Sequence, residues 1–119
     1  MRTKRPKKEL LSPAGSYEKM EAAFRYGADA VYLAGNMFGM RSAAKNFEKK
    51  ELFSAFDYAR SLGKKVYLTV NTLPRGYEYP ALKRYLRSLK QNAPDALIIG
   101  DIGVMALAKD ILPDTDIHI

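Results

Sequence analysis

The side chains with the clearest chemical potential in this sequence follow its predicted strands. Arg41 stands in a polar, glycine-containing stretch, and its guanidinium could form two parallel hydrogen bonds to a carboxylate or a phosphate. Asn71 and Thr72 follow one apolar run, and Asp101 follows another. Because α/β proteins bind ligands at the carboxyl ends of parallel strands, this pattern predicts a binding edge. The alternatives are an exposed loop arginine and a helix-capping aspartate.

The stretch from Glu9 to Ser16 is predicted to be a short buried strand that breaks into a loop and enters a helix. Two leucines form its apolar run, and the strand should end before Pro13 because proline cannot donate to a sheet ladder. Ser12 and Gly15 then lie in the loop, and Ser16 is a good helix N-cap. The alternative to a ligand-binding loop is a plain turn between a strand and a helix.

The composition limits the classes of protein and site. A chain of 119 residues with 47% apolar residues is expected to form one folded domain. It has no cysteine, which excludes a disulfide, a thiolate zinc site or an iron–sulfur cluster held by this chain, and we predict no metal site. A single histidine, His118, leaves little for a Ser-His-Asp triad. No apolar run approaches the roughly 20 residues of a membrane span, so we expect a cytoplasmic protein.

The positive charge is unevenly distributed. The net charge is +7, and five of the 20 basic residues lie in the first eight positions, leaving 15 basic against 13 acidic residues. We therefore divide the chain into a basic tail, residues 1–8, and an α/β domain, residues 9–119. The tail could contact RNA phosphates, or it could be a solubilising terminus.

Hydrophobic periodicity predicts alternating strands and helices after the first strand. Further strands are predicted at residues 30–34, 65–71, 96–100 and 116–119, and helices at residues 16–26, 49–62, 80–91 and from Asp101 to Pro113. The third helix carries a basic outer face, interpreted as a solvated surface, made of Lys83, Arg84, Arg87 and Lys90. The order βαβαβαβαβ predicts a parallel sheet with right-handed crossovers.

Two architectures fit this order. A five-stranded doubly wound sheet of the flavodoxin type would be complete at this length. A TIM-like (β/α)8 barrel needs about 250 residues, and this chain would be its N-terminal half. Length alone favours the doubly wound sheet, and strand order separates the two, because the first strand is central in one and the order is sequential in the other.

Several sequence stretches shift this balance. Residues 10–16 (LLSPAGS) and 26–33 (YGADAVYL) are followed by residues 38–43 (FGMRSA), 63–73 (GKKVYLTVNTL), 95–104 (DALIIGDIGV) and 113–119 (PDTDIHI). In this order and spacing they resemble the collagenase-like peptidase family, peptidase family U32. The resemblance covers almost the whole chain after Lys8.

The resemblance implies a TIM-barrel-like domain and two kinds of activity. Some family members are collagenase-like peptidases. Others act in oxygen-independent hydroxylation of transfer RNA, ribosomal RNA or the ubiquinone ring, with an iron–sulfur cluster and prephenate as the oxygen source. In family members the cysteines that bind the cluster lie after the segment that resembles this chain. Independent catalysis by this chain is therefore not expected, and we expect no cofactor within it.

The resemblance also guides the choice of site residues, because a barrel works at the carboxyl ends of its strands. It implies Arg41 as an anion clamp, Asn71 as a hydrogen-bonding orienter and Asp101 as a polar or acid–base group. His118 is the third catalytic candidate, and its alternative is a packed histidine of the fifth strand. The residues assigned to substrate or anion binding are Ser12, Gly15, Gly35, Arg41 and Thr72.

Three functions remain open at this point. The chain is the N-terminal part of a family enzyme, and the open edge of its fourth or fifth strand then invites a homodimer. Alternatively, it is a non-catalytic module that binds RNA or a partner protein. A complete doubly wound signalling domain is the third reading, and the lack of an acidic cluster after the first strand argues against it.

Overall fold

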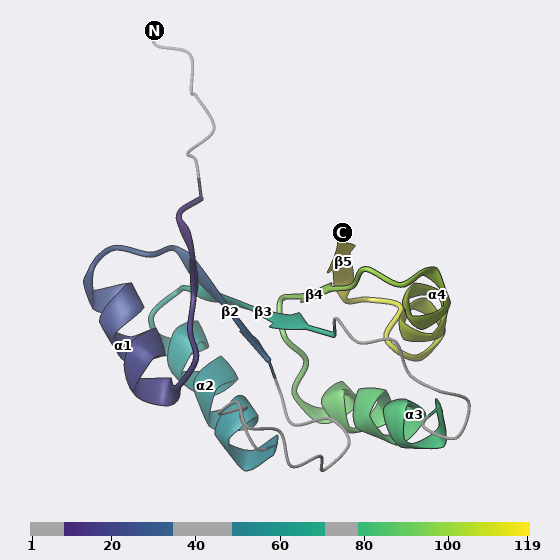
Figure 1. Cartoon of the computed structure of the whole chain (residues 1–119). Coiled ribbons are helices and arrows are strands. Elements are labelled where there is room, and N and C mark those ends of the chain that lie inside the picture. Colours follow the sequence, from purple (N-terminus) through teal and green to yellow (C-terminus); the bar gives the residue numbers. More distant parts are fainter. Residues whose placement is uncertain (1–8, 35–48, 71–78) are drawn as a thin grey trace, which may run out of the picture.

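The computed structural model describes residues 9–34, 49–70 and 79–119, which form a parallel sheet covered by helices (Figure 1). The elements are β1 (Leu11–Pro13), α1 (Tyr17–Arg25), β2 (Ala30–Ala34), α2 (Lys49–Ser61), β3 (Lys65–Thr69), α3 (Tyr79–Ser88), the 3-10 helix η2 (Leu89–Gln91), β4 (Ala96–Ile98), α4 (Ile102–Ile111) and β5 (Asp116–His118). The predicted alternation of strands and helices is confirmed.

The order of the strands distinguishes the two candidate architectures. The sheet runs β1-β2-β3-β4-β5, and every neighbouring pair is parallel. A flavodoxin-type sheet would place β1 inside the sheet between β2 and β3, so this order excludes that alternative. Sequential order is the order of a (β/α) barrel, although the described residues form an open sheet that does not close.

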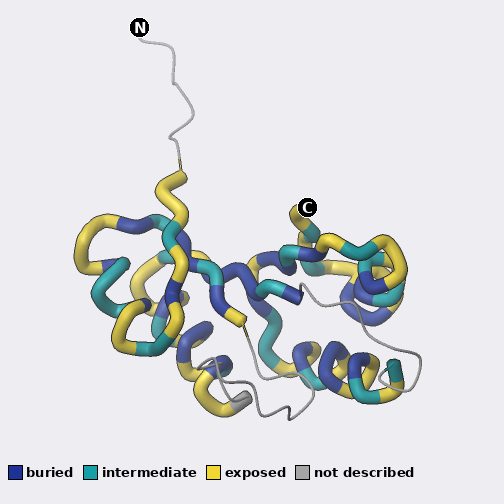
Figure 2. Tube along the Cα trace, viewed as in Figure 1, coloured by how far each residue is buried: buried dark blue, intermediate teal, exposed yellow. Residues whose placement is uncertain are grey.

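One face of the sheet holds the main core. Side chains from all four described α-helices pack there against alternate strand residues, among them Val31, Leu68 and Leu97, which are fully buried. Figure 2 colours the buried residues of the strands and helices dark blue. The helices turn their buried stripes toward this layer because their apolar residues recur at helical spacing. We call the opposite face, which these helices leave uncovered, the inner face. It carries a smaller cluster centred on Tyr67.

Local sequence signals account for where the helices begin and end. The Ser16 hydroxyl accepts a hydrogen bond from the Lys19 amide (3.2 Å), which caps α1 as predicted. Glycines follow α1 and α2 at Gly27 and Gly63, where φ is +104° and +69°. An L-residue with a side chain rarely adopts these angles, so glycine is suited to turning the chain back toward the sheet.

Strand β1 differs from the prediction in two ways. It includes Pro13, and it is not buried, because Leu11 is 42% exposed. Pairing continues past the proline because the Ala14 amide donates to the Tyr32 carbonyl (3.0 Å). β1 is an edge strand of this sheet, so the missing proline N–H falls on the side without a neighbouring strand. Leu11 is exposed because nothing in the described chain covers this edge of the inner face.

Candidate functional site

The strand register aligns the inner-face side chains in rows that cross the sheet. One row contains Tyr32, Tyr67, Ala96 and Asp116, and the next row toward the carboxyl edge contains Ala34, Thr69, Ile98 and His118. These rows mix aromatic, hydroxyl, carboxylate and imidazole groups, whereas the helix-facing rows are apolar. The inner face and its carboxyl edge are therefore the described surface best equipped for polar chemistry.

Tyr67 is the central side chain of the inner face. Only 5% of it is exposed, and its hydroxyl donates a 2.7 Å hydrogen bond to Glu9 Oε1. Burial, and then the hydrogen bond to the Glu9 carboxylate, raise the pKa of Tyr67 to about 12. Tyr67 is therefore a neutral hydrogen-bond donor throughout the physiological pH range.

His118 lies on the inner face in the last described strand. Its ring meets the ring of Tyr67 edge-on, with centroids 5.0 Å apart and planes at 76°. The residue is otherwise exposed, so the imidazole could still contact a ligand on the inner face. His118 therefore packs against Tyr67, as the alternative predicted, and it could also bind a ligand.

Asp101 lies at the carboxyl edge, directly before α4. Its Oδ2 accepts a hydrogen bond from the Val104 amide (2.9 Å) and caps the helix, as the alternative interpretation predicted. A Cβ at Gly103 would lie 3.2 Å from Asp101 Oδ2 and 3.4 Å from the Tyr79 hydroxyl. The absence of a side chain at Gly103 therefore leaves room for the capping carboxylate beside Tyr79. The acid–base role of Asp101 stays a prediction.

The other predicted site residues divide into two groups. Ser12 is paired with Val31, whose side chain faces the helices, and its hydroxyl donates a 3.4 Å hydrogen bond to the Pro13 carbonyl. Gly15 is exposed just before α1. The remaining four, Gly35, Arg41, Asn71 and Thr72, lie outside the described residues. Among Ser12, Gly15, Asp101 and His118, the described contacts bring no two together, so their shared site stays a prediction.

Sequence reasoning missed Tyr67 and its partner Glu9. Residues 65–71 are predicted as a strand, and the alternation of side chains along a strand puts Tyr67 and Thr69 on one face. The pattern does not say which face remains free of helices. Glu9 precedes the first strand and lies 58 positions from Tyr67, so no local pattern links them. Their contact depends on the pairing of β1, β2 and β3.

At the amino edge of the sheet, opposite the carboxyl edge described above, two aspartates each form the same pair of hydrogen bonds to a neighbouring strand. Asp29 precedes β2, and its Oδ2 accepts from the Leu10 amide (2.9 Å) while its own amide donates to the Leu10 carbonyl (2.9 Å). Asp95 precedes β4 and makes the same pair of bonds with Val66, at 2.8 and 2.9 Å. Each carboxylate extends the ladder by one bond, so both have a structural role here.

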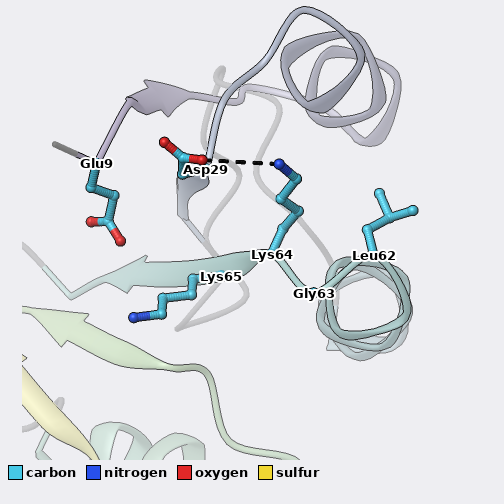
Figure 3. Close-up of a pocket in the computed structure, with 6 residues that line it drawn as sticks. All are labelled: Glu9, Asp29, Leu62, Gly63, Lys64 and Lys65. Carbon is cyan, nitrogen blue, oxygen red and sulfur yellow. Dashed lines mark ion pairs between the residues drawn. The ribbon is translucent and has the colours of Figure 1, made fainter. Parts of the chain in front are cut away.

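A cavity of about 320 Å³ opens at this amino edge. It is lined by Glu9, Asp29, Leu62, Gly63, Lys64 and Lys65 (Figure 3). Two of these lining residues form an ion pair, in which Lys64 Nζ lies 4.0 Å from Asp29 Oδ1 (Figure 3). Because α/β proteins with parallel sheets bind ligands at the carboxyl ends of their strands, we do not place the functional site in this cavity.

Metal and membrane features are limited in the described part of the chain. Residues 9–34, 49–70 and 79–119 contain no group of three His, Cys, Asp or Glu side chains arranged to hold a metal ion. None of the helices described there is long and apolar enough to cross a membrane. Iron–sulfur clusters are held mainly by cysteine thiolates, and the chain has no cysteine, so its residues do not fit such a cluster.

Comparison with known proteins connects this fold to one family. The family model described as Peptidase family U32 matches residues 15–119. A solved structure of a U32 peptidase superposes with a TM-score of 0.67 and covers 98% of this chain and 49% of the solved chain. Its sequence identity is 15%, so this likeness supports the fold alone.

Several relatives with higher sequence identity are named for RNA hydroxylation, and others are named as a protease or a collagenase. The tRNA hydroxylation protein P of Helicobacter pylori is 41% identical over 112 residues, which cover 93% of this chain and 26% of that protein. A 23S rRNA 5-hydroxycytidine synthase of Escherichia coli is 36% identical over 110 residues, which cover 92% of this chain and 16% of that protein. The chain spans about a quarter of the length of the first curated relatives it matches.

Proposed function

This chain belongs to peptidase family U32, and from that premise we propose that it forms the N-terminal part of an RNA-hydroxylating protein with tRNA as its substrate. The observation that carries the proposal is the 41% identity with a tRNA hydroxylation protein over 93% of the chain. Its five sequential strands would be the first five of a larger barrel. The proposal also places the protein in the cytoplasm, where tRNA is found.

In this proposal the inner face receives the target nucleoside. Proteins that bind unpaired RNA bases stack them on aromatic rings and bind their edges by hydrogen bonds. Tyr32 is a half-buried aromatic side chain on the inner face, and Thr69 and His118 provide polar groups in the adjacent row. Tyr67 would hold the His118 ring in place and would not bind the nucleoside itself, because its hydroxyl is already bound to Glu9 and its ring packs against His118.

The oxidative step would need groups that this chain does not have. When bound in the complete protein, the family's iron–sulfur cluster would supply the redox chemistry. Because this chain has no cysteine that could bind the cluster, we derive no step through the cluster. The role proposed for residues 9–119 is to bind and orient the nucleoside. Arg41 and Asn71 remain proposed as the anion clamp and the orienter of the same edge.

Peptide hydrolysis by a serine–histidine pair receives less support from the described residues. His118 is the single histidine of the chain, and its ring contact is with Tyr67. Ser12, which is predicted for substrate or anion binding, belongs to the helix-facing register, and its hydroxyl donates to the Pro13 carbonyl. These two side chains therefore do not form the nucleophile–base pair that such a mechanism requires.

A chimeric protein tests the proposal. The matched segment of the Helicobacter pylori tRNA hydroxylation protein is replaced by this chain and expressed in cells that lack their own hydroxylation protein. Hydroxylated nucleosides in total tRNA are measured by liquid chromatography and mass spectrometry. We expect the chimera to restore hydroxylation. A folded chimera that leaves tRNA unmodified, beside an active parent protein, would contradict the proposal and favour a non-catalytic module.

Two tyrosines provide a matched pair of variants for the inner face. Tyr32→Ala removes the proposed stacking ring, and a stacked base is worth about 1–3 kcal/mol, so we expect roughly a tenfold or greater loss of hydroxylation at limiting tRNA. Tyr26→Ala removes a ring that is 84% exposed at the end of α1 and should have no effect. Equal activity of the two variants would exclude the inner face as the nucleoside site.

The homodimer predicted from the open edges of the sheet has its own test. Two copies of this chain could pair through the open edges of β1 or β5, which have no neighbouring strand in the described sheet. Light scattering after size-exclusion chromatography would show a concentration-dependent dimer. A monomer at every concentration would count against this homodimer.

A further inference from the structure

We infer that the outer surface of α3 and η2 binds the phosphate backbone of the RNA, an inference that rests on the proposed function. We call this surface the α3 basic face, and it consists of Lys83, Arg84, Arg87 and Lys90. All of these side chains are exposed. The nucleoside site on the inner face would select the target, and the α3 basic face would hold the strand that leads to it.

The α3 basic face has no acidic neighbours along its own segment. Residues 79–91 contain no Asp or Glu, so all charges of α3 and η2 are positive. The other described α-helices mix both signs: α1 carries Glu18 beside Lys19, and α4 carries Lys109 beside Asp110. A surface that serves only for solubility usually intersperses the two signs, as those helices do.

The location of the remaining charge makes this segment stand out further. The α3 basic face has four of the 20 basic residues, and residues 1–8 have five. The rest of the chain has 11 basic against 13 acidic residues, which is a net charge of −2. The positive charge of the protein is therefore concentrated in these two segments, and the α3 basic face lies on the described elements α3 and η2.

The spacing of the cations suits a polyanion. Lys83 and Arg87 lie one helical turn apart on α3, with about 6 Å of axial rise between them, and Lys90 follows on η2. We call these three cations the stripe. Leu82 and Leu86 on the opposite side are fully buried against the core, so α3 cannot rotate to hide the stripe. A rigid row of cations can neutralise successive phosphates and release their counterions.

The stripe begins near the proposed nucleoside site. Tyr79 opens α3, and its hydroxyl lies 3.4 Å from where a Cβ of Gly103 would be, next to the Asp101 cap of α4. The first turn of α3 thus lies beside the first turn of α4, which follows the carboxyl end of β4. In this inference, an RNA strand bound along the α3 basic face leads toward the carboxyl edge of the inner face.

The test measures the binding of the chain to fluorescently labelled, unmodified tRNA by anisotropy over a salt series. In the triple variant Lys83→Gln/Arg87→Gln/Lys90→Gln we expect weaker binding. Each lost phosphate contact lowers the slope of log K against log salt by about 0.7–0.9, so the slope should fall by roughly 2–3. Circular dichroism checks that the triple variant is folded. The single variant Arg87→Glu should also weaken tRNA binding.

A control variant has the same change in net charge elsewhere. Lys19→Gln/Arg25→Gln/Lys109→Gln removes two lysines and one arginine that are exposed on α1 and α4. It should keep the salt slope and nearly all of the affinity. If both triple variants weaken binding equally, net charge alone accounts for the effect and the inference fails.

Two further arms distinguish the α3 basic face from a tail-mediated contact and from a membrane-binding surface. If deletion of residues 1–8 abolishes the salt dependence while the α3 triple variant keeps it, the basic tail binds the RNA and the inference is wrong. If the α3 basic face binds phosphatidylglycerol vesicles but not tRNA, it is a membrane-binding surface instead, which also overturns the inference. The chimera and the free chain give separate results. If the chimera is inactive but the free chain still binds tRNA through the α3 basic face, the proposed function is wrong and this inference holds.

Discussion

Replacing Tyr67 with phenylalanine tests how the inner face is held together. The substitution removes the hydroxyl that donates to Glu9 Oε1 over 2.7 Å and leaves the ring that packs on His118 in place. A hydrogen bond to a charged group contributes about 1.5–3 kcal/mol. Glu9 is exposed, so its carboxylate regains water in the variant, and we expect a loss near the lower end, about 1–1.5 kcal/mol.

The pH dependence of the same variant makes the test sharper. Below pH 10 Tyr67 keeps its proton in both the folded and the unfolded chain. Between pH 10 and about 12 the unfolded chain loses this proton while the folded chain retains it, so stability is lost as the pH rises through this window. Phenylalanine has no proton to lose. The difference in free energy of unfolding between the two proteins should therefore be largest below pH 10 and shrink above it.

Urea unfolding followed by circular dichroism, near neutral pH and in the alkaline range, measures both effects. A double-mutant cycle with Glu9→Gln isolates the Tyr67–Glu9 pair from other losses. A Tyr67→Phe protein that is as stable as the native chain near neutral pH would refute the reasoning. So would a stability difference that stays constant through the alkaline range.

Three further substitutions test the framework that positions the inner face. Asp95→Ala removes the acceptor of the buried Val66 amide and should cost about 1–3 kcal/mol of unfolding free energy, whereas Asp95→Asn keeps an oxygen there and should cost less in the same urea titration. Gly63→Ala places a side chain at φ +69° and should lower stability by about 1 kcal/mol, while Gly15→Ala, which has no positive φ, should cost less. Leu68→Ala empties a fully buried position on the central strand and should cost about 2.7–5 kcal/mol by thermal or urea unfolding; a smaller loss would mean that the core there is loosely packed.

The local structure of this protein could largely be predicted from its sequence. Helix faces follow from residues such as Leu82 and Leu86, which recur at helical spacing and are buried as predicted. The caps at Ser16 and Asp101 follow from side chains that can bind the first free amides of a helix. These features depend on residues at most a few positions apart, so a linear pattern records them. The family membership, too, could be predicted from short stretches in order.

The arrangement of these elements was decided only in the tertiary structure. Periodicity predicted five parallel strands, but it could not choose between a sequential and a doubly wound order, since both use the same alternating elements. The exposure of Leu11 and the continuation of β1 through Pro13 both follow from β1 being an edge strand. An edge position is a property of the whole sheet, and no single segment encodes it.

The inner face shows the same division. Sequence placed His118 in a strand and Tyr67 in another, and it left Glu9 without a role. Strand pairing brought these three residues together from positions 9, 67 and 118, where the Tyr67 hydroxyl binds Glu9 and its ring meets His118. The sequence by itself determined which residues each strand offers to its two faces. Only the packing of all four described helices on one side decided which of those faces was left uncovered by helices.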